Sequence, residues 1–197
     1  MGTLERLQSS AAVLFAERGY AGTSMSRIAD SVGVRKASLY NYYNSKEALL
    51  EDLVNRGIEA WNEACEEPLK GSENPRQQLR TYFREIFAFV EAHPETVALI
   101  RVASTQIGGS LGQRFRRPVL QEQGQMVNDV ARLCRVAMDR GEMKEADPRE
   151  VALFWTAMVD GILINKLFAT PRAPELGSRL DGLWERLWLA MGGIDAE

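Results

Sequence analysis

The stretch 23–46 constrains the fold more than any other part of the chain, because it predicts two short helices joined by a tight glycine turn. Thr23 and Ser24 are residue types that cap helix N-termini. Apolar residues follow them at the i, i+3, i+4, i+7 spacing of one helix face: Met25, Ile28, Ala29 and Val32. Gly33 then permits a positive φ, so the chain can turn sharply into a second helix. The pattern predicts a helix-turn-helix.

The second of these helices carries hydrogen-bond donors and aromatic rings on its outer face, but no carboxylate. Leu39 and Tyr43 lie four residues apart and are expected to face inward. The outward set is then Arg35, Lys36, Ser38, Asn41 and Tyr42. This face suits a DNA phosphate backbone and a major groove, with Lys36 and Ser38 within reach of base edges. For any one of these residues, an ordinary solvated position is the alternative interpretation.

Asn44 and Glu47 form a capping-box-like pair that predicts the start of a third helix. The helix N-termini at Ser24 and Asn44 would also direct backbone N–H groups towards an anion. The third helix is expected over about 46–66, before Pro68 ends it. Because it links the helix-turn-helix to the rest of the chain, we expect its movement to move the recognition helix.

Residues 6–56 resemble the N-terminal DNA-binding domain of the TetR family of bacterial transcriptional regulators. The matching features are Phe15, Arg18-Gly19-Tyr20, Gly22-Thr23-Ser24, Ile28-Ala29, Gly33-Val34, Leu39-Tyr40, Tyr42-Tyr43 and Ser45-Lys46-Glu47. The resemblance implies phosphate contacts from Thr23, Tyr40 and Lys46. It implies base or mixed contacts from Arg27, Arg35, Lys36, Ser38 and Tyr42. Where the family often has serine, this chain has Arg35, which exchanges a cap residue for a positive charge.

Charge is spread unevenly over the 197 residues, whose net charge is only −3. Residues 1–46 hold six Lys or Arg and three Asp or Glu, a balance of +3, and the remaining 18 basic and 24 acidic residues give −6. The basic segment suits a nucleic-acid-binding domain, and the acidic remainder would lie away from DNA. We expect an all-α protein with a helix-turn-helix DNA-binding domain over 1–46. The helical domain over 47–197 would, by the resemblance, bind an effector and dimerise.

Several function classes find no support in the sequence. There is no signal peptide and no run of eighteen apolar residues, so we expect a cytoplasmic protein without a membrane span. Cys65 and Cys134 lack metal-ligand spacing and are interpreted as buried small hydrophobic residues. His93, the only histidine, has no partner for a catalytic triad, and no phosphate-binding glycine loop is present. We therefore expect no enzyme, no catalytic or metal-binding residue and no cofactor.

The remainder of the chain is expected to be helical, with boundaries set by proline and glycine. One helix is predicted from Pro75 to His93, and a shorter one follows it to Gly108. A long amphipathic helix is predicted between Pro118 and Gly141. Two further helices complete the prediction, one from about residue 147 to 168 and one that ends before residue 192.

The predicted helix over 147–168 is apolar nearly all round, and such a helix needs burial on two sides. Phe154, Trp155 and Met158 lie on the face expected to contact its own body. The second face is expected to contact another subunit, beside the last helix. The predicted homodimer interface comprises Ala152, Val159, Leu163, Leu167, Trp184 and Trp188. This arrangement is similar to that of the TetR family, in which the last two helices of each subunit form a four-helix interface.

The resemblance also implies a small-molecule pocket in the body. Ligand pockets are mostly apolar and aromatic, with a few polar anchors. The candidate lining residues are Trp61, Phe83, Phe87, Ile100, Arg101, Met126, Trp155 and Met158. Each apolar candidate has a plain core position as its alternative, and Arg101, a candidate anchor for an anionic group, has a solvated one. The basic cluster Arg114, Arg116 and Arg117 is interpreted either as a site for coenzyme A thioester phosphates or as a solvated loop.

These features predict a homodimeric, ligand-responsive transcriptional regulator that binds double-stranded DNA. The preferred interpretation is a repressor that leaves a pseudo-palindromic operator when it binds a small apolar or amphipathic effector. The operator, the effector and the sign of regulation do not follow from one sequence. A helical scaffold or adaptor that retains the module without binding DNA is the alternative.

Overall fold

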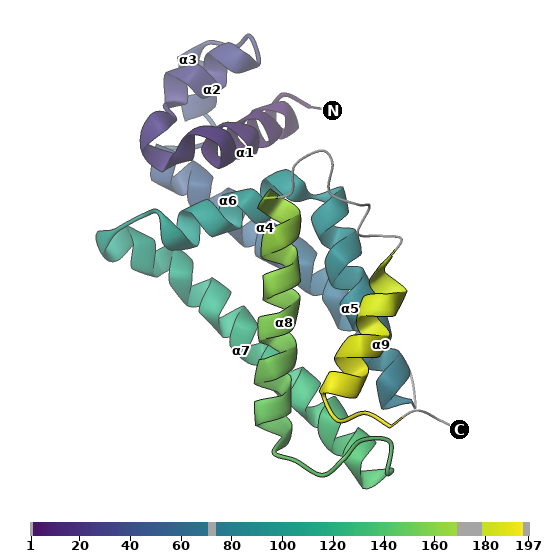
Figure 1. Ribbon diagram of the computed structural model, residues 1–197. Helices are drawn as coiled ribbons and strands as arrows, with labels where there is room; N and C mark the ends of the chain where they lie inside the picture. Colours follow the sequence, from purple (N-terminus) through teal and green to yellow (C-terminus); the bar gives the residue numbers. More distant parts are fainter. Residues whose placement is uncertain (1, 71–73, 169–178, 195–197) are drawn as a thin grey trace. The chain divides into compact units, whose positions relative to one another are not determined.

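The computed structural model describes residues 2–70, 74–168 and 179–194, and every regular element in those ranges is a helix (Figure 1). The helices are α1 (Thr3–Gly22), α2 (Met25–Ser31), α3 (Lys36–Tyr40), α4 (Lys46–Lys70), α5 (Pro75–Ala92), α6 (Pro94–Thr105), α7 (Gly109–Asp139), α8 (Pro148–Phe168) and α9 (Leu180–Ala190). Met143 and Gly193 form an isolated antiparallel β-bridge. The predicted all-α class is confirmed.

The chain divides into two compact units. Unit 1 comprises Met1–Asn62 and Val90–Glu122, and unit 2 comprises Glu63–Phe89 and Gln123–Glu197. The helices α4, α5 and α7 therefore contribute residues to both units. The domain division after residue 46, which was drawn from the charge pattern, stays a prediction.

The core of unit 1 joins the helix-turn-helix to α6 and to the first turns of α7. Fully or almost fully buried apolar side chains from these elements form one cluster: Leu7, Phe15, Ile28, Leu39, Leu49, Leu50, Val54, Leu99, Ala103, Ile107 and Phe115. The regular geometry of α1 is broken at Gly19, where φ is +69°, a conformation that glycine tolerates. The three N-terminal helices thus share their core with helices from the middle of the chain.

Close contact between α4 and α6 depends on Gly57. A Cβ atom added at Gly57 would lie 2.7 Å from Cγ2 of Thr96 and 3.1 Å from Cδ1 of Ile100. Any larger residue at this position would therefore push the two helices apart. An ion pair adds to the same unit, because the Arg114 guanidinium on α7 donates to the Glu51 carboxylate on α4 at 2.5 Å.

The core of unit 2 is built from aromatic rings on α5, α8 and α9. Tyr82 stacks on Trp155 with ring centres 5.5 Å apart, and Phe83 lies 5.9 Å from Trp184. Both cysteines are buried and unpaired by disulfides, and burial raises the pKa of the Cys134 thiol to about 12. They are small core residues, as predicted.

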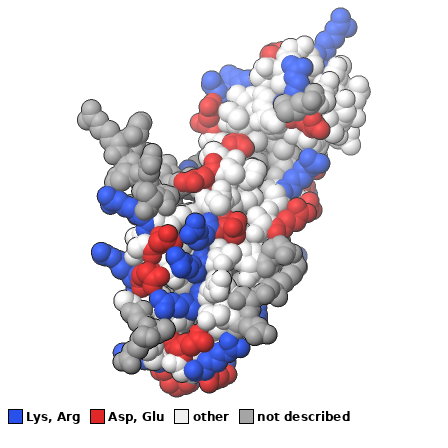
Figure 2. Space-filling model, turned by 90° about the vertical axis from the view of Figure 1, so that its right-hand side faces the viewer, with Lys and Arg blue, Asp and Glu red and all other residues white. Residues whose placement is uncertain are grey.

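The surface of Figure 2 carries acidic and basic side chains next to one another rather than in separate patches.

Three predicted helix boundaries are wrong. Helix α7 begins at Gly109 rather than after Pro118, because Phe115 is buried in the core of unit 1 and holds the first turns in place. Helix α4 passes Pro68 and ends at Lys70. Its N-cap is Ser45 rather than Asn44, since the Ser45 hydroxyl accepts a hydrogen bond from the Ala48 N–H at 3.1 Å.

None of the described helices is long and apolar enough to span a lipid bilayer. Among the same residues, no group of three His, Cys, Asp or Glu side chains could hold a metal ion.

Candidate nucleic-acid interface

The predicted helix-turn-helix is present and is fixed by local contacts. The Ser24 hydroxyl caps α2 by accepting a hydrogen bond from the Arg27 N–H at 3.2 Å, and the Arg27 guanidinium donates to the Gly22 carbonyl at 2.6 Å. Gly33 adopts a φ of +72° in the turn, a conformation that side chains disfavour. Leu39 is completely buried and anchors α3 to the core. The five-residue helix α3 is therefore held in one orientation.

The face of α3 that points away from the core carries cations and aromatic rings. Arg35 and Lys36 are exposed, and the side chains that follow include Tyr40 at 43% exposure and Tyr42 at 48%. The Lys36 ammonium lies 5.7 Å from the centre of the Tyr40 ring, within reach of a cation–π contact. Ser38 is half-buried. Because no carboxylate occurs between residues 35 and 43, nothing on this face repels a phosphate.

Thr23 and Lys46 use their side chains inside the protein. Thr23 is only 2% exposed, and its hydroxyl lies 3.0 Å from the carbonyl oxygens of Leu14 and Gly19. The Lys46 ammonium donates to the carbonyls of Tyr20 (2.8 Å) and Thr23 (2.9 Å) and lies 3.9 Å from the centre of the Tyr20 ring. A cation satisfies carbonyl groups that the end of a helix leaves open. Both side chains stabilise the end of α1, and phosphate contacts from them stay predictions.

A polar network that was not predicted connects α1, the segment after α3, and α4. The Tyr43 hydroxyl donates to the Asp52 carboxylate at 2.5 Å. The Gln8 amide donates to the Tyr43 hydroxyl at 2.7 Å and to the same carboxylate at 3.1 Å. The Arg56 guanidinium donates to the Gln8 amide oxygen at 3.3 Å. The network thus ties the end of the recognition segment to the helix that leads out of the module.

Both tyrosines that bond to α4 have raised pKa values. Burial is the main reason that the pKa of Tyr43 rises to about 12, and its hydrogen bond to Asp52 adds to the effect. The Tyr20 hydroxyl donates to Glu47, and the pKa of Tyr20 is likewise raised, mainly by burial. The hydrogen bond from Tyr20 lowers the pKa of the Glu47 carboxyl. Both tyrosine hydroxyls are therefore protonated at neutral pH and can donate to their partners.

The N-terminal module matches a known family of proteins. The sequence profile of the family described as "Bacterial regulatory proteins, tetR family" matches residues 7–53, which contain the helix-turn-helix and the first turns of α4. The N-terminal module of this chain, residues 7–53, matches the TetR family.

Relatives from the TetR family are transcriptional regulators rather than enzymes. The transcriptional repressor KstR2 of Mycobacterium tuberculosis (strain ATCC 25618 / H37Rv) is 34% identical over 90 residues, which cover 45% of this chain and 44% of that protein. The transcriptional activator FasR of Mycolicibacterium smegmatis is 30% identical over 95 residues, 48% of this chain and 43% of that one. The chain thus spans less than half the length of these curated relatives.

The fold of a solved regulator structure matches nearly the whole chain. The crystal structure of AibR in complex with isovaleryl coenzyme A and operator DNA superposes with a TM-score of 0.76. The alignment covers 96% of this chain and 98% of that chain at 23% identity. At this level of identity the likeness establishes the fold.

The residues predicted from the TetR resemblance to line an effector pocket are divided between the two units. Phe83, Phe87, Met126 and Trp155 are buried in unit 2, and Met158 in the same unit is 44% exposed. Trp61, Ile100 and Arg101 belong to unit 1, where Trp61 and Ile100 are half-buried and Arg101 is exposed. The aromatic core of unit 2 therefore gathers half of the predicted set.

Two tryptophans in this core have polar groups that find no hydrogen-bond partner among the described residues. The indole N–H groups of Trp155 and Trp184 are both buried and unpaired, and both side chains are 0% exposed. The neighbouring Trp188 differs, because its indole N–H donates to the Ile194 carbonyl at 3.4 Å. An unpaired N–H in an apolar interior is unfavourable, so these two groups require an explanation.

The dimer interface predicted for the TetR fold does not coincide with the exposed face of α8. Ala152, Val159, Trp184 and Trp188 are 0–2% exposed because they pack inside their own protomer, and Leu163 is half-buried. The side chain of Leu167 lies outside the described part of the structure. The opposite side of α8 instead presents large apolar groups to solvent: Leu153 (54% exposed), Phe154 (41%), Met158 (44%) and Ile164 (51%).

We expect the substitution Tyr43→Phe to lower the free energy of unfolding by about 1 kcal/mol at pH 8, because Asp52 loses a partly buried donor. The effect is pH-dependent. Since the pKa of Tyr43 is raised in the folded protein, its contribution is complete below pH 10 and is lost as the pH approaches about 12. Urea unfolding at several pH values should therefore show the difference between the variant and the parent shrinking over that interval.

The matched control is Tyr42→Phe, which removes a hydroxyl from an exposed ring. This variant should change the free energy of unfolding by less than about 0.5 kcal/mol at every pH. Equal losses in the two variants would contradict the structural role assigned to the network.

Proposed function

We propose that this protein is a transcriptional regulator that binds double-stranded operator DNA and acts as a repressor. The observation that carries the proposal is the outer face of α3, where Arg35, Lys36, Tyr40 and Tyr42 are exposed on a rigid helix-turn-helix. The names of the relatives support the regulatory class, and KstR2 supports repression as its sign. The role of FasR as an activator makes the sign a separate question for experiment.

In this proposal α3 enters the major groove and the aromatic and basic side chains around it contact the backbone. Lys36 and Ser38 both lie in the first turn of α3, so these are the candidates for base edges. Arg27, Tyr40 and Tyr42 are the candidates for phosphate contacts. Thr23 and Lys46 would contribute by stabilising the end of α1, which directly precedes the helix-turn-helix.

The proposed dimer forms through the exposed apolar side of α8. Leu153, Phe154, Met158 and Ile164 lie on one broad side of α8 at about 100° per residue, and Leu189 on α9 is a further exposed apolar residue at 51%. A contiguous apolar helix face exposed to water commonly marks an association surface. A second copy of this chain is the proposed occupant, since two recognition helices about 34–36 Å apart would read a pseudo-palindrome.

The proposed effector is a small apolar or amphipathic molecule that binds in the aromatic core of unit 2. The unpaired indole N–H groups of Trp155 and Trp184 support an effector that carries hydrogen-bond acceptors, such as carbonyl oxygens. AibR, whose fold this chain shares, forms a complex with isovaleryl coenzyme A and operator DNA, a precedent for a carbonyl-containing effector. The same precedent keeps an acyl thioester among the candidates.

Helix α4 is the proposed connection between effector and DNA. Its first turns are tied to the module by Asp52, Glu47 and Lys46, and its residues beyond Asn62 belong to unit 2. An effector that favours a different position of α4 would change the spacing of the two readers. The coupling must be reciprocal, so operator DNA would weaken effector binding by the same factor.

The substitution Lys36→Ala should weaken operator binding about tenfold or more without altering the melting temperature, because Lys36 is exposed and makes no core contact. If Lys36 contacts a phosphate, the slope of log affinity against log salt should also fall by about one. Fluorescence anisotropy with a palindrome selected from a DNA library measures both quantities. Lys144→Ala, an equal loss of charge at an exposed position of unit 2, is the control.

Equal affinities for the parent and the two variants would contradict the proposed DNA face. A parent protein that selects no DNA at all would instead favour the helical scaffold.

The substitution Met158→Glu should dissociate the proposed dimer, because it places a charge in the middle of the apolar side of α8. Sedimentation equilibrium should show a monomer with an unchanged helical circular dichroism spectrum. Leu120→Glu is the matched control, since Leu120 is exposed to 62% on α7 and is not part of the exposed α8 side. A dimer that survives Met158→Glu but not Leu120→Glu would place the interface elsewhere.

The substitution Trp184→Phe should reduce the response to effector more than Trp188→Phe does. Of these two residues, Trp184 has an indole N–H without a hydrogen-bond partner among the described residues, whereas the Trp188 N–H donates to the Ile194 carbonyl. The effector is obtained from protein purified from its own source, detected by native mass spectrometry and extracted. The concentration of this extract that releases half of the operator DNA is then measured for the parent and both variants. Identical concentrations would exclude an anchoring role for Trp184.

A further inference from the structure

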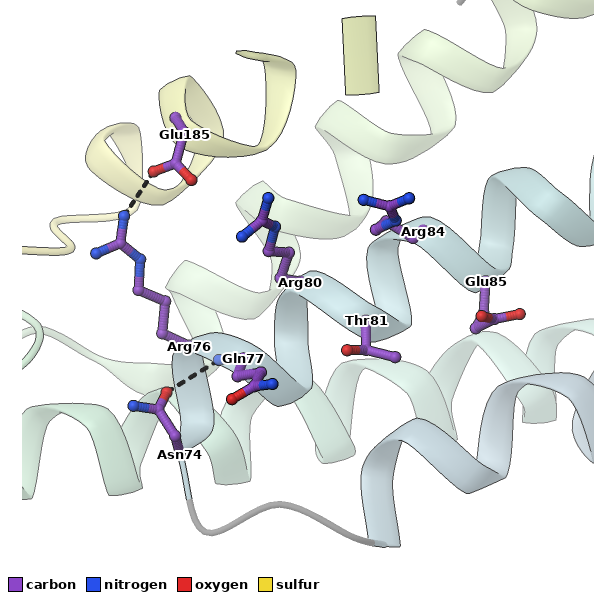
Figure 3. Close-up of a pocket in the computed structure, with 8 residues that line it drawn as sticks. All are labelled: Asn74, Arg76, Gln77, Arg80, Thr81, Arg84, Glu85 and Glu185. Atoms are coloured by element: carbon purple, nitrogen blue, oxygen red, sulfur yellow. Dashed lines mark hydrogen bonds and ion pairs between the residues drawn. The ribbon is translucent and has the colours of Figure 1, made fainter. Parts of the chain in front are cut away.

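A pocket lies on the surface of unit 2, between α5 and α9, and Figure 3 shows the side chains that surround it. Its volume is about 490 Å³, within the range of small-molecule sites. The lining is polar throughout: Asn74, Arg76, Gln77, Arg80, Thr81, Arg84, Glu85 and Glu185. None of the residues predicted to bind an effector belongs to this set. The pocket is therefore unsuited to an apolar ligand.

Three arginines form one row along the pocket. Arg76, Arg80 and Arg84 are spaced four residues apart, so they project from the same side of α5 (Figure 3). At 1.5 Å per residue the row is about 12 Å long, which exceeds the size of a single phosphate or carboxylate group. Guanidinium groups bind both kinds of anion through paired N–H donors. The row matches a ligand that carries at least two anionic groups.

The arginines are held in place by two carboxylates on α9. The Arg76 guanidinium donates to Glu185 at 2.5 Å, and those of Arg80 and Arg84 donate to one Asp181 oxygen at 2.9 and 3.1 Å. The hydrogen bond from Arg80 is the main reason that the pKa of the Asp181 carboxyl is lowered. These pairs orient the three guanidinium groups in the absence of a ligand. Solvent-exposed pairs of this kind are individually weak.

The carboxylates can therefore be exchanged for a stronger anion. The Asp181 side chain is 61% exposed and that of Glu185 is 45% exposed, so each can rotate into water when its partner is taken. A dianionic group that accepts hydrogen bonds from two neighbouring guanidinium groups gains more than one exposed carboxylate does. Gln77 and Thr81, on the adjacent row of α5, supply neutral hydrogen-bonding groups for the rest of a ligand.

We propose that the pocket between α5 and α9 binds a small polyanion, whose phosphate or carboxylate groups replace Asp181 and Glu185 on the arginine row. This site is separate from the apolar effector region and does not depend on DNA binding. Because both displaced carboxylates belong to α9, occupancy exchanges the ion pairs that join α9 to α5 for bonds to the ligand. Asp181 is thus a competitor of the ligand as well as a partner of the arginines.

The first test is isothermal titration calorimetry of the full chain with inorganic pyrophosphate and with citrate, at one ionic strength. Acetate is the monoanionic comparison. We expect saturable binding of at least one polyanion and none of acetate, and the preferred polyanion identifies the anionic group. The double variant Arg80→Gln, Arg84→Gln should raise the dissociation constant at least about tenfold. Arg132→Gln, Arg186→Gln, an equal charge change on exposed residues outside the pocket, should leave it within about twofold.

The second test uses the competing carboxylate. Asp181→Asn should tighten polyanion binding about threefold or more, whereas Asp139→Asn, the same charge change on an exposed residue of α7, should not. Circular dichroism melts establish that each variant is folded. Absence of binding by either polyanion, or equal effects of the pocket variants and their controls, would overturn the proposal. Neither result depends on whether the protein binds an operator.

Discussion

The apolar core that the N-terminal helices share with α6 and α7 is the constraint on which the arrangement of the reader depends. A three-helix module of this size buries too little apolar surface to be rigid alone. Leu99 and Phe115 on α6 and α7, and Ile107 between these helices, complete its core from more than forty residues further along the chain. The absence of a side chain at Gly57 allows the necessary approach of α6 to α4. The orientation of α3 is therefore a property of unit 1 as a whole.

Polar contacts then make α4 part of the same rigid body. Tyr20 and Tyr43 each donate to a carboxylate in the first two turns of α4, and Lys46 binds the end of α1. Buried networks in which every member is satisfied favour one geometry over its alternatives. Movement of α4 must consequently carry α3 with it rather than bend the module. This rigidity supplies the mechanical basis for the regulation that we propose.

Local sequence patterns predicted the helix-turn-helix correctly. Contacts between residues far apart in the sequence determined the features that could not be predicted. Gly33 and the spacing around Leu39 specify the helix-turn-helix from within a short segment, so it was predicted correctly. The predicted start of α7 was wrong because Pro118 was interpreted as the helix boundary. The helix begins at Gly109 instead, since Phe115 is buried in the core of unit 1. The partners of Tyr43 could not be predicted, since Gln8 lies 35 residues away.

The two sides of α8 bear on the predicted dimer interface and on the proposed link between effector and dimer. A helix that is apolar all round has no polar side to indicate its orientation, so the sequence pattern placed Phe154 and Met158 inward together with Trp155. The structure turns Trp155 inward against Tyr82 and leaves Phe154 and Met158 outside. In the proposed dimer, a ligand that displaces Trp155 must shift Met158 less than one turn away. Because packed helices move as rigid elements, the dimer interface would then respond to the effector directly.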